Sequence, residues 1–241
     1  MLPRIDTPTY EITLPSTGKK TRFRPFLVKE EKILLMAQQG EDLDEKINAI
    51  KQIIRNCLIE DIDIDALATF DIEYLFVNLR SKSVGNIINL TYKRKECPNK
   101  DDGAGDCDLP FTMDLENVKV EETDQGHSTN VQITDRISII MKYPDFNVLN
   151  KILLSENYDD IVEVIATCIE YITEDNEVLN ASDYTIEEII EFIENLTQTQ
   201  FASINDFFET MPETNCAVNI RCRQCEFKKE MKVSGVADFF S

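Results

Sequence analysis

The chain has 241 residues with 45 acidic and 25 basic side chains, a net charge of −20 and an apolar fraction of 42%. This size allows a buried core in one large domain or two small ones. The negative charge disfavours bulk binding to phosphate backbones and anionic lipid and favours basic protein partners. No stretch is apolar enough to span a bilayer and the N-terminus lacks a signal-peptide core, so we expect a protein of the reducing cytoplasm.

Residues 1–85 predict an N-terminal β-hairpin followed by helices. Apolar and polar residues alternate in Tyr10–Leu14, and Thr21–Phe26 returns as a second strand after turn residues. Helices are predicted over Val28–Gln39 and Asp71–Lys82. Between them, residues at three- and four-residue steps mark one apolar face of a further helix: Leu43, Ile47, Ile50, Ile54 and Cys57.

Two separated segments, 86–125 and 212–241, have the alternation of β-strands. Strands are predicted at Asn86–Tyr92 and near Phe111–Leu115, and again around Val218–Ile220 and Phe227–Val233. A pair of cysteines lies between the two strands of each segment. We therefore predict a discontinuous, zinc-ribbon-like β module assembled from both segments.

Residues 126–211 are predicted to be a mostly helical insertion in this β module. One strand is expected at Arg136–Lys142. Thr185 and Glu188 have the spacing of a capping box at a helix start. Two stripes have helical spacing, and they consist of Ile161, Ile165, Cys168 and Ile172, and of Ile186, Ile189, Ile190, Ile193 and Leu196. The predicted fold class is thus α+β.

Four cysteines in two pairs, Cys97 with Cys107 and Cys222 with Cys225, predict a structural zinc site. Structural zinc prefers four tetrahedral ligands, and two intervening residues let both sulfurs of a Cys-x-x-Cys turn face one ion. The nine-residue spacing of the first pair is looser, but its loop contains two glycines. In a reducing compartment, spaced cysteines indicate metal ligands more often than disulfides.

Other interpretations of the cysteines remain open at this point. The four could be reduced thiols without metal, and Cys216 could replace one ligand. Cys57 and Cys168 lie on apolar helical stripes and are expected to be small core residues. Basic residues crowd the paired cysteines, and these could neutralise thiolates or form a small nucleic-acid patch: Lys93, Arg94, Lys95, Lys100, Arg221, Arg223, Lys228 and Lys229.

The sequence contains no motif that predicts catalysis. The single histidine, His127, lies in a polar stretch and is expected to be a solvated loop residue. The acidic run Asp61–Asp65 could bind a hard cation but lacks the glycine and distal glutamate of a calcium loop, and the run Asp101–Asp108 raises the same possibility. A metal-dependent hydrolase is the weakest of the alternatives, and the protein is expected not to be an enzyme.

The N-terminal segment resembles a known family. Leu2–Ile5, Tyr10–Lys19 and Phe23–Lys32 resemble the T4-type bacteriophage baseplate hub proteins, which include a hub subunit and a hub assembly catalyst. The resemblance implies a late viral protein that helps to build the central hub of a contractile tail, with baseplate hub proteins as partners. It implies no catalytic residues, and the zinc site is inferred from this sequence alone.

The leading functional hypothesis is therefore assembly of the tail baseplate hub through protein–protein contacts. The protein would act in the host cytoplasm as an assembly chaperone, or remain in the virion tail baseplate as a hub component. The alternative is a zinc-ribbon regulator that binds nucleic acid, which the basic residues near the cysteines would serve.

Overall fold

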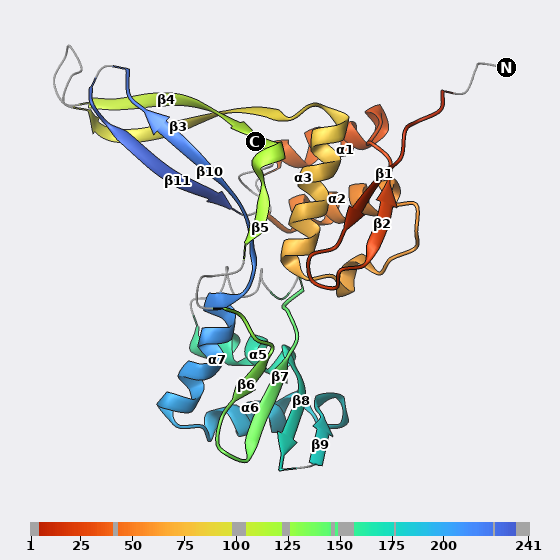
Figure 1. The fold of residues 1–241 in the computed structure, drawn as a ribbon, viewed down its shortest axis with the longest axis vertical. Helices are drawn as coiled ribbons and strands as arrows, with labels where there is room; N and C mark the ends of the chain where they lie inside the picture. The colour runs from red at the N-terminus through yellow and green to blue at the C-terminus, as the bar shows by residue number, and fades with distance from the viewer. Residues whose placement is uncertain are drawn as a thin grey trace. The chain divides into compact units, whose positions relative to one another are not determined.

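The computed structural model describes residues 5–40, 43–97, 105–121, 126–145, 148, 157–175, 177–223 and 225–234. These residues form helices and several small antiparallel sheets, which confirms a mixed α and β fold (Figure 1). Contacts divide the chain into two compact units. Unit 1 comprises residues 1–64, 70–121 and 213–241, and unit 2 comprises residues 65–69 and 122–212.

The N-terminal part of unit 1 is the predicted hairpin followed by three helices, with bounds β1 (Tyr10–Thr13), β2 (Lys20–Phe23), α1 (Val28–Gln39), α2 (Leu43–Cys57) and α3 (Thr69–Ser83). Helix α1 has the predicted bounds. The face of α2 that carries Ile50, Ile53 and Ile54 is fully buried. The three- and four-residue spacing seen in the sequence therefore marks the core side of this helix.

Buried carboxylates connect the hairpin to these helices. Asp71, in the first turn of α3, is completely buried and accepts hydrogen bonds from the Ser16 amide, at 3.0 Å, and from the Ser16 hydroxyl. Glu30 of α1 is also buried and forms an ion pair with Arg24 at 3.1 Å. A buried charge is tolerated only with such partners, so these contacts fix the hairpin against α1 and α3.

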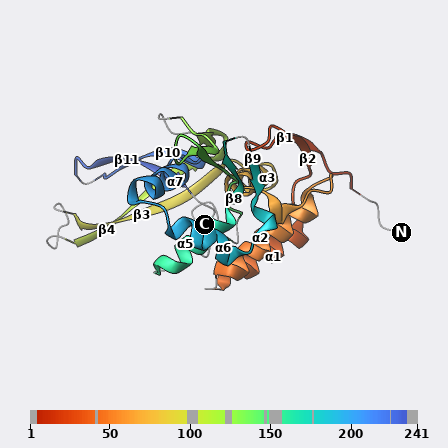
Figure 2. The same cartoon turned by 90° about the horizontal axis from the view of Figure 1, so that it is seen from below.

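The β module of unit 1 consists of a two-stranded hairpin and a three-stranded sheet. The hairpin pairs β3 (Ile87–Cys97) with β4 (Gly105–Asp114). The sheet has the order β11–β10–β5, with bounds β5 (Lys119–Glu121), β10 (Glu213–Arg221) and β11 (Lys228–Ser234). Figures 1 and 2 show the β3–β4 and β10–β11 hairpins extending in the same direction from the rest of unit 1.

One apolar cluster holds the β module together. Its buried side chains come from α3, from both hairpins and from the turn before β5: Val77, Ile88, Cys107, Leu109, Met113, Leu115, Val118, Cys216, Val218, Ile220 and Val233. The cluster joins side chains from two segments that lie far apart in the sequence. The description of the β module as a zinc ribbon gains no support, because the strands are long and pack through a hydrophobic core.

Unit 2 contains a four-stranded antiparallel sheet in the order β6–β7–β8–β9. The strands are β6 (Asn130–Gln132), β7 (Ile137–Met141), β8 (Ile169–Glu174) and β9 (Glu177–Asn180). One face of the sheet shares a core with three helices, α5 (Tyr158–Thr167), α6 (Ile186–Glu194) and α7 (Gln198–Thr210). Short 3₁₀ turns lie at Ile64–Ala66, Leu115–Asn117 and Ala181–Asp183.

A sheet accompanies the helices of this segment, where the sequence predicted one strand only. The stripe from Ile161 to Ile172 does not belong to one helix, since α5 ends at Thr167 and Ile172 lies in β8. The three- and four-residue spacing of these apolar residues is compatible with a helix, which is why the sequence predicted one. The β-branched and aromatic residues of β8 favour a strand.

The capping box at Thr185 and Glu188 is confirmed. The Glu188 amide donates to the Thr185 hydroxyl at 3.3 Å, and the Thr185 amide donates to the Glu188 carboxylate at 2.8 Å.

Among the residues that the structure describes, no helix is long and apolar enough to cross a bilayer.

The contact of the Glu60 carboxylate with Thr21 and Arg22 is expected to be sensitive to acid. Hydrogen bonds from the Arg22 amide and guanidinium, at 2.7 and 2.8 Å, and from the Thr21 hydroxyl lower its pKa from 4.5 to about 2. Because this pKa is lower in the folded chain, the carboxylate stabilises the fold above about pH 4.5, and this contribution is lost as the pH falls toward 2. Denaturation of Glu60→Gln should show a smaller loss of stability across that window than the wild type. Glu116→Gln, at an exposed site, should retain the wild-type pH profile.

Met113 tests the apolar cluster of the β module. Its side chain is completely inaccessible and lies opposite Ile88 on the paired strand. Met113→Ala should lower the free energy of unfolding by about 2–5 kcal/mol, because it leaves a cavity that packed strands cannot close. Thr112→Ala, on the exposed face of the same strand, should change it by less than about 0.5 kcal/mol. Equal small effects in chemical denaturation would show that the two hairpins do not depend on this core.

Candidate functional site

The paired cysteines lie at the ends of the two hairpins. In β3–β4, the backbone register places Cys97 opposite Gly105 and Arg94 opposite Cys107. The register shifts between these two residue pairs. In β10–β11, Cys222 begins the turn, and its amide donates to the Phe227 carbonyl at 3.0 Å. The sequence prediction placed Cys97 and Cys107 in a loop between two strands, whereas β3 extends to Cys97 and β4 already includes Cys107.

Three of the four predicted zinc ligands belong to one side-chain cluster. Cys107 is buried in the core of the β module, and Cys222 and Cys225 are half-buried and pack against the same core. The Cys97 side chain lies outside the described residues. Among the side chains that are described, no three histidines, cysteines or acids are grouped as metal ligands. The fold thus brings the two hairpin ends together, while the zinc ion itself stays a prediction.

Basic side chains link the two hairpins next to the cysteines. The Arg94 guanidinium of β3 donates to the Cys225 sulfur at 3.2 Å and lies 4.1 Å from the centre of the Phe227 ring. Lys229 of β11 donates to the Tyr92 hydroxyl at 3.2 Å, with its ammonium 4.9 Å from the ring centre. Arg94 can therefore stabilise negative charge on a thiolate, as the sequence suggested. Both cations also contribute packing between the hairpins.

The remaining described cysteines are core residues. Cys57 and Cys168 are fully buried, and burial raises the pKa of these thiols to about 11 and about 12, which confirms the expectation for them. Cys216 is buried too, and its thiol donates to the Asp114 carbonyl at 3.8 Å. It precedes Cys222 by six residues of extended chain, about 20 Å at 3.3 Å per residue. Cys216 therefore does not replace a ligand at the hairpin end.

His127 is not the solvated loop residue that the sequence predicted. Its ring is half-buried and packs against Tyr143 and Phe207, with ring centres 5.5 and 5.0 Å away. Its Nδ1 lies 3.1 Å from the Thr210 hydroxyl. The aromatic partners come from separate elements, so no local pattern could reveal this packing. The described contacts of the ring do not form a nucleophile–base–acid arrangement.

The N-terminal segment Phe23–Phe26 packs into the core of unit 1. Phe23 and Phe26 are buried, and Arg24 binds Glu30 and donates to the Asn56 carbonyl at 2.9 Å. Of the acidic runs, Asp101 and Asp102 lie outside the described residues.

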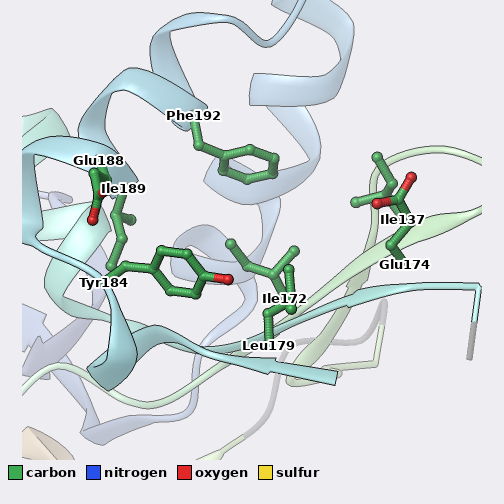
Figure 3. Close-up of a pocket in the computed structure, with 8 residues that line it drawn as sticks. All are labelled: Ile137, Ile172, Glu174, Leu179, Tyr184, Glu188, Ile189 and Phe192. Carbon is green, nitrogen blue, oxygen red and sulfur yellow. The ribbon is translucent and has the colours of Figure 1, made fainter. Parts of the chain in front are cut away.

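Sequence reasoning missed an apolar groove in unit 2. Ile137, Ile172 and Leu179, on neighbouring strands, line one side of a space of about 350 Å³. Figure 3 shows the rings of Tyr184 and Phe192 facing this space from the other side. The remaining lining residues are Glu174, Glu188 and Ile189. The groove forms where three strands and a helix pack together, so no local sequence pattern could predict it. The isoleucines of the strands indicated only that this part of the chain is apolar.

The negative charge is concentrated in unit 2. Unit 2 holds 20 acidic and 3 basic residues, a net charge of −17, whereas unit 1 holds 25 acidic and 22 basic residues, a net charge of −3. The apolar groove therefore lies in a strongly negative unit, which attracts cationic partners and repels polyanions.

A family comparison identifies the class of protein to which this chain belongs. The model of the T4 bacteriophage base plate protein family matches residues 7–241, nearly the whole chain. The chain therefore belongs to this family, and the resemblance noted in its first residues is confirmed as a T4-type baseplate protein. No curated protein and no solved structure matches the chain.

The zinc site at Cys97, Cys107, Cys222 and Cys225 has a direct test. We expect about one zinc ion per chain, and Cys222→Ser should release it and lower the melting temperature, because three ligands cannot complete the tetrahedron. Elemental analysis of protein purified under reducing conditions measures the metal. Cys216→Ala, in the core away from the hairpin end, should keep the zinc. Full zinc and full stability in Cys222→Ser would remove the site.

Proposed function

We propose that this protein acts in assembly of the tail baseplate hub through protein–protein contacts, either as a hub component or as an assembly chaperone, and that it has no enzymatic activity. The family match over residues 7–241 carries the proposal, because it indicates a phage baseplate protein. Other baseplate proteins are then the natural partners. The strongly acidic unit 2 supports contact with basic protein surfaces.

The nucleic-acid alternative has little support. The net charge of −17 on unit 2 opposes a phosphate backbone. Arg94 and Lys229, two of the basic residues on which that alternative depended, contact Phe227 and Tyr92 within the β module. A salt-dependent shift of DNA or RNA by the purified protein would reverse this judgement.

Recovery from infected cells tests the proposed function. An affinity-tagged copy should co-purify with hub proteins from lysates of phage-infected cells, with an unrelated tagged late protein as the control. Consistent recovery without any hub protein would argue strongly against a role in the hub.

Mass spectrometry of purified particles beside the lysate separates the two forms of the proposal. A hub component should be present in both samples in a fixed ratio to other baseplate proteins. An assembly chaperone should be abundant in the lysate and depleted from the particles.

A further inference from the structure

The groove in unit 2 is a part of the core that the helices leave uncovered. Ile139 of β7 lies opposite Ile172, which lies opposite Leu179, so the three side chains share the face of the sheet that packs on the helices. Ile139 is completely buried, whereas Ile137, Ile172 and Leu179 are half-buried. The apolar face therefore continues past the helical cover at the β8–β9 end of the sheet.

The dimensions of the groove suit large apolar side chains. Its volume of about 350 Å³ lies near the lower end of the range of ligand pockets, which is enough for one or two such side chains. Tyr184 is 43% exposed and places an aromatic ring at the opening. Half-buried aliphatic and aromatic groups of this kind form anchor pockets in protein interfaces.

Carboxylates stand at the rim of the groove. Glu174 lies opposite Ile137 in the β7–β8 ladder, so it projects on the same face as the apolar lining. Glu188 approaches from α6, where it also caps the helix. The acidic residues of α6 are Glu187, Glu188, Glu191 and Glu194, and this helix contains no basic residue. Arg136 offsets part of the rim charge through Asp175, at 2.5 Å, and Glu174, at 3.8 Å.

We propose that this groove is a docking site for a lysine- or arginine-rich segment of another protein, which inserts one or two large apolar side chains. The apolar lining would supply affinity through burial, and the acidic rim would select a cationic segment and speed its association. The inference deepens the proposed function, since it gives the kind of baseplate partner segment that unit 2 would recognise.

A tiled peptide array supplies the probe. Full-length protein is applied to 15-residue peptides that cover the tail proteins of the same phage genome. Bound peptides should be enriched in lysine or arginine together with large apolar residues, and binding of the best peptide in solution should weaken with added salt. No binding, or selection of acidic peptides, would overturn the inference.

Two neighbouring residues on opposite faces of β9 form a matched pair of variants. Leu179→Asp places a charge in the groove and should weaken binding of the selected peptide at least tenfold. Val178→Asp, at a site that is 65% exposed on the other face, should leave binding unchanged. Equal binding by both variants would show that the peptide binds elsewhere.

A second pair of variants tests the acidic rim in case Leu179→Asp does not fold. Glu174 has a 54% exposed side chain, so Glu174→Lys should fold and still weaken binding by charge reversal at the rim. Glu209→Lys, on an exposed position of α7 that does not line the groove, is its control. Unchanged binding by Glu174→Lys would exclude the acidic rim as a selector.

Failure of this inference can be told apart from failure of the proposed function. If the tagged wild-type protein and Leu179→Asp recover hub proteins equally well, the hub role stands and the groove is not the docking site. If even the wild-type protein recovers no hub protein, the proposed function itself is wrong.

Discussion

The short pairing of β5 with β10 is the constraint on which the rest of the structure depends. It places Glu121 opposite Glu213, and so holds together the two ends of the insertion 122–212. Closing a loop of that length costs about 4 kcal/mol of chain entropy, because this cost grows with the logarithm of the loop length. Burial of Thr214, whose hydroxyl donates to the Phe70 carbonyl at 3.0 Å, and the ion pair of Glu121 with Lys232 at 3.1 Å help to offset it.

Strand β10, which pairs with β5, also forms the hairpin that carries the second cysteine pair. Strand β10 begins beside β5 and ends at Arg221. The turn that starts at Cys222 therefore lies at the end of the β10–β11 hairpin that is remote from β5. The shared core then aligns the hairpins, and Arg94 bridges them at the Cys225 sulfur. A metal ion at this end would reinforce a contact that apolar packing already makes.

The two units differ in chemistry as well as in fold. Unit 1 is nearly balanced in charge, and two of its basic residues, Arg94 and Lys229, make contacts between the hairpins. Unit 2 carries most of the negative charge together with an incompletely covered apolar groove. In a baseplate protein, this combination favours recognition of basic protein segments, with charge for selection and apolar burial for affinity.

The sequence by itself determined the local elements: helix α1, the N-terminal hairpin and the capping box of α6 all follow from neighbours within a few residues. It could not decide that α5 gives way to β8, because the apolar spacing fits both structures until a partner strand is present. Only the tertiary structure decided that Cys216 is a core residue, that His127 packs on Tyr143 and Phe207, and that a groove opens beside Leu179. Each of these depends on residues far apart in the chain, whose proximity is set by strand pairing and core packing.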